Sequence, residues 1–229
     1  MRRRASTTLS AALLATLTLS SCAGSNTAAG DPGSSPTAPG KPAPVAKPSV
    51  PLTSAALAGR LLDETDLGQG YTRKPETDSS RDDVTVIGCP ALENLGGDAA
   101  AGGNLDFPNS AKATFAYTRG TDSEVAEELY SDTEDKLGPG TKTVFKAMTS
   151  CPIYQVVVGD APIAVATQKL PAPALGDEAW SQLLTFTAGG RDTVMKQTAV
   201  RAGSVLVVVS GSPALVDTHL TRAVDKARG

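Results

Sequence analysis

The chain has 229 residues and a formal net charge of −3. Residues 1–21 hold three of the 21 Lys and Arg residues and none of the 24 Asp and Glu residues, so removing them takes the charge from −3 to −6. Nucleic acid binding requires a basic face that displaces counterions, and an anionic lipid surface attracts polybasic segments. The remaining chain offers neither, and we expect no nucleic acid partner.

The N-terminus has the pattern of an export signal. Arg2, Arg3 and Arg4 precede an apolar stretch from Ala11 to Leu19, and a basic start before a short apolar run is typical of a secretory signal. The run is far shorter than the ~20 residues of a membrane-spanning helix. Leu19-Ser20-Ser21-Cys22 follows it and resembles the bacterial lipobox. That resemblance implies that the Cys22 thiol carries a diacylglycerol; the alternative is a secreted soluble protein with an incidental cysteine.

The lipobox divides the chain into three parts. We predict a signal peptide at 1–21 and a lipidated N-terminus followed by a disordered linker at 22–51, which is rich in Gly, Ser, Thr, Ala and Pro. Residues 52–229 form one globular domain, because they are numerous enough for a real core. Two acyl chains give stable anchoring. We therefore expect a lipid-anchored protein on the extracytoplasmic face of the cell membrane.

Two further cysteines, Cys89 and Cys151, belong to the predicted domain. An even pair in an exported chain favours a disulfide, which for a loop of this length would stabilise the fold by roughly 4 kcal/mol on the chain-entropy model. A redox or metal role would need CxxC spacing or nearby histidines, and the sequence has neither around these positions.

Hydrophobic periodicity predicts the elements of the domain in chain order. We expect helices at 54–64, 90–95, 123–137, 141–150 and 213–226. We expect strands at 71–74, 84–87, 111–117, 153–158, 163–168, 179–188, 192–201 and 204–210. Gly138-Pro139-Gly140 separates the two middle helices in this interpretation.

Short connections between consecutive strands imply antiparallel pairing. The predicted class is α+β, in the form of a single domain with a twisted, mainly antiparallel sheet of about 5–6 strands and with helices packed on one face.

The sequence offers few candidates for catalysis. His219 is the only histidine, and we expect it on the surface of the terminal helix. The sequence contains no GxSxG, HExxH or P-loop motif, and no SxxK arrangement of the serine β-lactamase kind. We therefore predict no enzyme, no catalytic residue, no metal and no cofactor, and the ligand-binding residues are left unknown.

Acidic residues form two groups: Asp63, Glu64 and Asp66, and then Glu124, Glu127, Glu128, Asp132, Glu134 and Asp135. The second group is interpreted as the solvated face of the helix at 123–137, with cation binding as the alternative. Asp82-Asp83 lacks the alternating oxygen ligands of a calcium loop.

Several motifs together resemble a known family. They are Leu61-Leu62, the run from Asp66 to Tyr71, Cys89-Pro90 at a helix start, Cys151 after a helix, and Val205–Val209 before the last helix. This pattern resembles the extracellular sensor domain of the mycobacterial PknH serine/threonine kinase and related actinobacterial lipoproteins. The resemblance implies a sheet packed against helices with a ligand-binding cleft. The family has two disulfides where this chain can form one, and no kinase accompanies the domain in this sequence.

These observations lead to one main hypothesis and two alternatives. The main hypothesis is a non-catalytic, sensor-like module of the cell envelope that binds a small molecule, a lipid or an envelope fragment. The first alternative is a protein-interaction or structural component that contacts an envelope protein through the acidic helix or an exposed sheet edge. The second is a hydrolase that uses carboxylates, for which the sequence nominates no particular acid.

Overall fold

The computed structural model describes residues 50–76, 84–96, 105, 107–119 and 123–229. These residues lie in one compact unit, Ala46–Gly229. The predicted signal peptide, Cys22, nearly all of the linker and Asp82-Asp83 lie outside the described residues. Within these ranges, no helix combines the length and the apolar character that crossing a bilayer requires.

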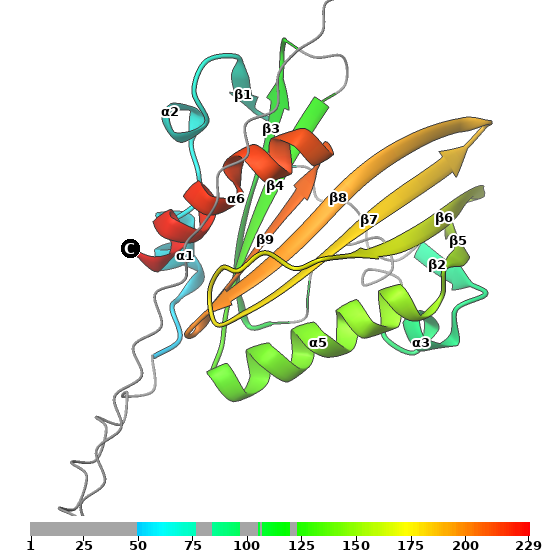
Figure 1. Cartoon of the computed structure of the whole chain (residues 1–229), viewed down its shortest axis with the longest axis horizontal. Coiled ribbons are helices and arrows are strands. Elements are labelled where there is room, and N and C mark those ends of the chain that lie inside the picture. Colours follow the sequence, from blue (N-terminus) through cyan, green and yellow to red (C-terminus); the bar gives the residue numbers. More distant parts are fainter. Residues whose placement is uncertain (1–49, 77–83, 97–104, 106, 120–122) are drawn as a thin grey trace, which may run out of the picture. The chain divides into compact units, whose positions relative to one another are not determined.

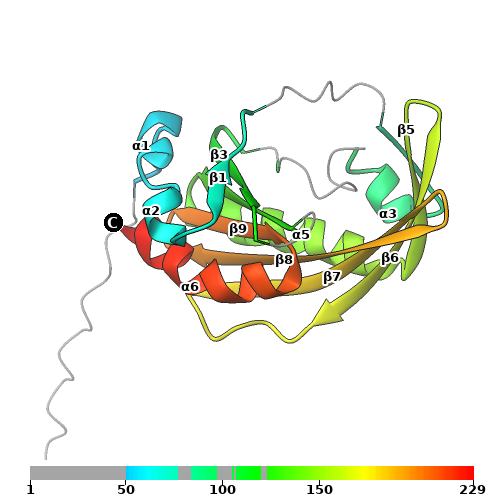
Figure 2. The ribbon, with the colours of Figure 1, turned by 90° about the horizontal axis from the view of Figure 1, so that it is seen from above.

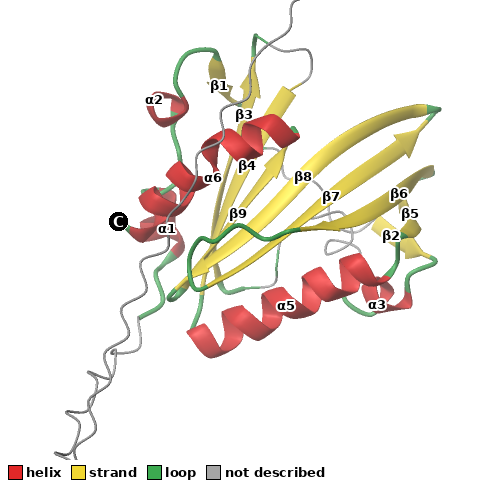
Figure 3. Cartoon of the chain, in the orientation of Figure 1, coloured by secondary structure: helices red, strands yellow, loops and turns green. Residues whose placement is uncertain are grey.

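Nine strands form a single antiparallel sheet in the order β1-β3-β4-β9-β8-β7-β6-β5-β2 (Figures 1 and 3). The strands are β1 (Tyr71–Arg73), β2 (Val84–Ile87), β3 (Asn109–Tyr117), β4 (Ser123–Ser131), β5 (Ile153–Val158), β6 (Ala161–Leu170), β7 (Glu178–Ala188), β8 (Arg191–Ala202) and β9 (Val205–Gly211). The helices are α1 (Ser54–Ala58), α2 (Glu64–Leu67), α3 (Pro90–Glu93), α5 (Glu134–Ser150) and α6 (Pro213–Arg228). The predicted α+β class is confirmed, and the strand count exceeds the predicted 5–6.

Strands β5 to β9 follow one another as a meander, as their short connections predicted. Gly189 and Gly190 join β7 to β8 with φ values of 57° and 76°. A two-residue turn with positive φ at both positions matches the right-handed twist of the strands that it joins, and glycine adopts it without steric cost. This meander brings β6 and β7 side by side beneath α5.

The centre of the sheet is apolar on both faces. On β9, Val205, Val207 and Val209 pack in one cluster with residues of α6 and α1. Leu206 and Val208 point to the opposite face and pack in another cluster with residues of α5. Because side chains alternate along a strand, each face needs its own cover. The structure therefore corrects the expectation that helices cover one face: α6 and α5 lie on opposite faces (Figure 2).

The helix predicted at 123–137 is wrong in its first nine residues, which form β4. β4 lies between β3 and β9 in the sheet. Val125 and Leu129 face the α6 side, and Tyr130 faces the α5 side. The acidic residues hid this period-two pattern, because Glu127 and Glu128 are buried in the sheet rather than exposed on a helix.

Gly138-Pro139-Gly140 does not end a helix but lies inside α5. Two threonine hydroxyls bond to backbone carbonyls around this segment. Thr141 Oγ1 donates to the Leu137 carbonyl at 2.8 Å, and Thr143 Oγ1 donates to the Pro139 carbonyl at 2.9 Å. The glycines permit close contacts. A Cβ on Gly140 would lie 3.0 Å from the Phe107 ring. The two helices predicted at 123–137 and 141–150 are therefore one strand and one helix.

The helix predicted at 54–64 ends early, at Ala58, and a separate helix, α2, begins at Glu64. Asp63 caps α2, since its carboxylate accepts from the backbone N–H groups of Thr65 and Asp66. Such capping residues favour a new helix start over continuation of the previous helix. Leu62 lies between the two helices, and its backbone N–H therefore donates to Glu127 of β4 instead of to a helical carbonyl.

The predicted disulfide is present. Cys89 and Cys151 are bonded, with their Cα atoms 5.7 Å apart. Cys89 immediately precedes α3 and Cys151 immediately follows α5. The bond thus fastens α3 to the C-terminal end of α5, where Leu92 and Met148 share one apolar cluster.

Candidate functional site

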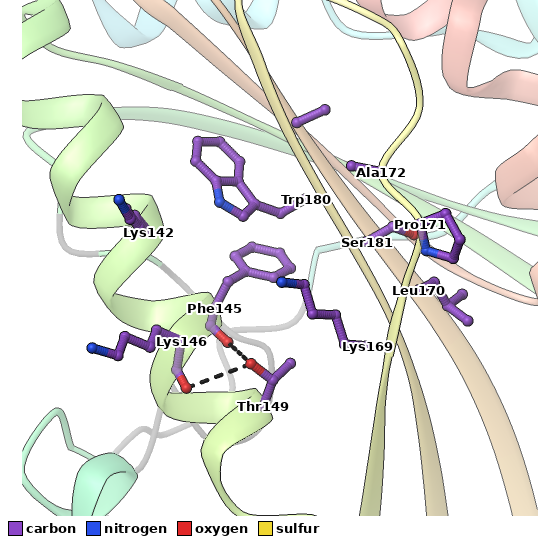
Figure 4. Close-up of a pocket in the computed structure, with 11 residues that line it drawn as sticks. Lys142, Phe145, Lys146, Thr149, Lys169, Leu170, Pro171, Ala172, Trp180 and Ser181 are labelled. Carbon is purple, nitrogen blue, oxygen red and sulfur yellow. Dashed lines mark hydrogen bonds between the residues drawn. The ribbon is translucent and has the colours of Figure 1, made fainter.

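A cavity of about 570 Å³ opens between α5 and the neighbouring strands β6 and β7 (Figure 4). One wall is a stripe of α5, the second is the end of β6 with the loop after it, and the third is the start of β7. The lining residues are Lys142, Phe145, Lys146, Thr149, Lys169, Leu170, Pro171, Ala172, Ala179, Trp180 and Ser181. A volume of this size suits a small organic ligand.

Two aromatic rings form the deep apolar part of this cavity. Phe145 of α5 and Trp180 of β7 stack with their ring centroids 6.2 Å apart and their planes at 26°. Phe145 is buried, whereas Trp180 is only half-buried. Trp180 projects from β7 toward α5 (Figure 4). Trp180 therefore presents exposed ring surface to whatever enters.

Three lysines supply the charge of the cavity. Lys142 and Lys146 lie on consecutive turns of α5, and Lys169 comes from the end of β6. In Figure 4, Lys169 extends toward the Phe145 ring. All three are exposed, and the lining contains no acidic residue. The cavity is therefore basic within a chain whose net charge is −3.

The hydroxyl groups of the lining are already bonded within the protein. Thr149 Oγ1 donates to the Phe145 carbonyl at 2.7 Å (Figure 4). Ser181 Oγ lies 2.9 Å from Thr198 Oγ1 on β8. The lysine ammonium groups are thus the main polar groups left to contact a ligand.

His219 is buried, contrary to its expected place on the surface of the terminal helix. Its Nε2 lies 2.6 Å from the Tyr71 hydroxyl. Burial lowers the pKa of His219, and burial followed by the proximity of Tyr117 raises the pKa of Tyr71. A phenol with a raised pKa is a poor nucleophile at neutral pH. The pair fastens β1 to α6.

Glu127 of β4 is the most unusual carboxyl group of the described chain. It is 1% exposed, and its Oε2 accepts from the Leu62 N–H at 2.6 Å. Its Oε1 has no hydrogen-bond partner in the described structure. Burial raises its pKa to about 7, although the Leu62 hydrogen bond acts in the opposite direction. The neutral acid is therefore substantially populated near pH 7. Burial on β4 places this side chain in the core rather than on a solvated helix face.

Glu128 lies next to Glu127 but points to the other face of the sheet. Lys112 Nζ and the Tyr130 hydroxyl both donate to it at 2.5 Å. The two strongest candidates for a buried acidic pair therefore face opposite sides, and no carboxylate pair of the kind a hydrolase uses arises from them.

The first acidic group holds α2 against α6. Lys226 donates to both Asp63 and Asp66, and Arg222 donates to Asp66 at 2.8 Å. Burial alone would raise the pKa of Asp66, but the hydrogen bonds from Lys226 and Arg222 outweigh it and lower that pKa to about 2. These acids are structural. Among the described residues, no group of three or more His, Cys, Asp or Glu side chains could hold a metal ion.

The lysines of the cavity were not predicted from the sequence. A usable signal existed, because Lys142 and Lys146 are like charges at i,i+4 spacing, a pairing that destabilises a helix. Phe145, on the same helix, packs into the apolar cluster beneath α5. Lys169 and Trp180 could not be linked to α5 without knowing that β6 and β7 lie beneath that helix.

Fold and site together define an antiparallel α+β domain with a lateral cavity between its long helix and its sheet. No family model and no curated protein matches the sequence. Among solved structures, the extracellular domain of PknH from Mycobacterium tuberculosis matches with a TM-score of 0.58 and 15% sequence identity, covering 78% of this chain and 97% of that chain. The fold predicted from the motif pattern is therefore confirmed as one that the two proteins share.

The environment of Glu127 predicts a pH-dependent stability. Its folded pKa of about 7 lies above its ordinary value of 4.5, so the folded protein retains a proton that the unfolded chain releases. The contribution is fully present below pH 4.5 and is lost as the pH rises through 7, by about 3 kcal/mol in total. We expect urea denaturation of Glu127→Gln to lack this fall between pH 5 and pH 8.

Glu124→Gln is the matched control, since Glu124 lies on the same strand but is only half-buried and paired with Lys74. It should keep the wild-type fall in stability. If Glu127→Gln loses stability with pH as the wild type does, the buried carboxyl is not the source.

Proposed function

We propose that this protein is a non-catalytic ligand-binding module, sensor-like in character, on the extracytoplasmic face of the cell envelope. The observation that carries this proposal is the cavity between α5 and β6–β7, with exposed Trp180 surface inside it. The extracytoplasmic location is supported by the disulfide, since such bonds persist in oxidising compartments, and by a fold shared with an extracellular domain.

The chemistry of the cavity favours binding over catalysis. Its lining contains neither histidine nor carboxylate, and general acid–base catalysis of hydrolysis relies on such groups. The hydroxyls of Thr149 and Ser181 are bonded within the protein without an adjacent base. Aromatic and aliphatic surface with a few charged groups at its edge is typical of a ligand pocket.

Protein interaction is the second candidate function, and one observation supports it. The edge strand β2 and its neighbour β5 carry Ile87 and Ile153, which are 50% and 70% exposed. Exposed sheet edges of this kind can pair with another chain. The version of this hypothesis that used an acidic helix is excluded, because residues 123–131 form a strand.

Trp180 provides a direct test, because it is the only tryptophan. Residues 46–229 contain all three apolar clusters and are expected to fold alone. The neutral dye N-phenyl-1-naphthylamine should bind this segment and quench Trp180 emission by energy transfer. Trp180→Ala should weaken binding about tenfold, measured by the fluorescence of the dye itself.

Phe186→Ala is the control variant, since Phe186 is also half-buried and lies on the same strand and the same face as Trp180. It should bind the dye like the wild type. Absence of quenching, or equal loss in both variants, would contradict a binding site at Trp180.

We further propose that Cys22 anchors the protein through lipid, as its lipobox-like context predicts. The full-length Cys22→Ala variant expressed in an actinobacterial host should lose the mass of the lipid and leave the membrane fraction. Cys151→Ala is the control, because it removes a cysteine outside the lipobox and should stay in the membrane. Retention of Cys22→Ala in the membrane would rule out this anchor.

A further inference from the structure

The charge distribution around the cavity indicates which ligands it can hold. Lys142 and Lys146 of α5 and Lys169 of β6 line it on two sides, and no acidic side chain belongs to its lining. In Figure 4, Lys169 extends into the space between helix and strands, whereas the exposed side chains of Lys142 and Lys146 extend away from the strands. In the described part of the chain, none of the three ammonium groups forms an ion pair. Other surface lysines do, for example Lys74 with Glu124 and Lys136 with Asp132. The cavity therefore gathers three cations that have no ion-pair partner among the described residues.

Two of these cations also repel each other. Lys142 and Lys146 are four residues apart on α5, where like charges destabilise a helix. A bound anion between them would relieve this repulsion. Lys169 on β6 faces the same space, so an anion could be contacted from the helix and from the sheet.

The apolar part of the cavity requires more than a simple anion. Phe145 and Trp180 present stacked rings, and Leu170 and Pro171 add aliphatic surface. A small inorganic ion would leave this surface in contact with water. Burying it would be favourable at roughly 25 cal/mol per Å². The ligand therefore needs an apolar body in addition to its charge.

We infer that the cavity binds an anionic amphiphile, one molecule with an apolar or aromatic body and a single sulfonate-, phosphate- or carboxylate-type head group. The inference rests on the proposed function and specifies its ligand class. The body lies against Trp180 and Phe145, and the head group contacts Lys169, with the exposed side chains of Lys142 and Lys146 turning toward it from α5.

A matched pair of dyes isolates the charge. 8-Anilinonaphthalene-1-sulfonate has the skeleton of N-phenyl-1-naphthylamine with a sulfonate added, and both quench a nearby tryptophan. For segment 46–229 we expect the sulfonate to bind more tightly than the neutral dye. Replacing Lys142, Lys146 and Lys169 together by Gln should weaken the sulfonate about 10-fold and leave the neutral dye unchanged.

Lys136→Gln is the control, because Lys136 lies on the same helix and outside the cavity. It should bind both dyes like the wild type. Raising the salt concentration from ~0.15 M to ~1 M should weaken only the sulfonate, since the screening length falls from ~8 Å to ~3 Å. Circular dichroism of the triple variant verifies that it folds.

Competition distinguishes possible sources of the ligand. Two competitors are used below their critical micelle concentrations. Decyl sulfate represents an anionic amphiphile that is not a lipid, and dihexanoylphosphatidylglycerol represents an anionic phospholipid. Displacement of the sulfonate dye by either supports the inference, and the tighter competitor identifies the source. Displacement by neither would overturn it, as would equal displacement by inorganic sulfate.

The outcomes also separate this inference from the proposed function. If the neutral dye binds at Trp180 but the sulfonate binds no tighter, the cavity is a ligand site without preference for anions and the inference fails alone. If neither dye quenches Trp180, the proposed function fails with it.

Discussion

The structure depends on a sheet centre that is apolar on both faces. β9 is apolar at every position from Val205 to Val209, so that Val205, Val207 and Val209 require one cover and Leu206 and Val208 require another. α6 follows β9 directly and covers the first face. The second face is covered by α5, which comes from a distant part of the chain and is fixed at its end by the disulfide from Cys89 to Cys151.

The cavity follows from how α5 meets the sheet. Near its C-terminal end, Met148 of α5 packs with Cys89 and Leu184 in one apolar cluster. In its middle, Phe145 meets Trp180, and beside this contact the end of β6 and the following loop leave room between helix and sheet. The same helix thus closes part of the core and borders the cavity, with its lysines on the open side.

Local patterns predicted the parts of the fold whose partners are close in sequence. The meander from β5 to β9 and helix α6 were expected nearly as observed, because tight turns and alternation specify them. β4 was misassigned because its buried acids bond to residues that are distant in the sequence. Glu127 accepts from the Leu62 N–H, and Glu128 accepts from the Lys112 ammonium group. Likewise, Gly140 was interpreted as a helix terminator, whereas it allows the approach of Phe107. The site joins α5 to β6 and β7, and no local signal could show that pairing.

Hydrogen–deuterium exchange of segment 46–229, with and without N-phenyl-1-naphthylamine, tests most directly whether the space between α5 and β6–β7 is the ligand site. Slowed exchange should appear at 142–149, at 169–172 and at the start of β7, because a bound ligand raises the cost of local opening there. α6 and the β2–β5 edge should exchange at the same rates with and without the dye. Protection at that edge alone, or nowhere in the chain, would contradict this account.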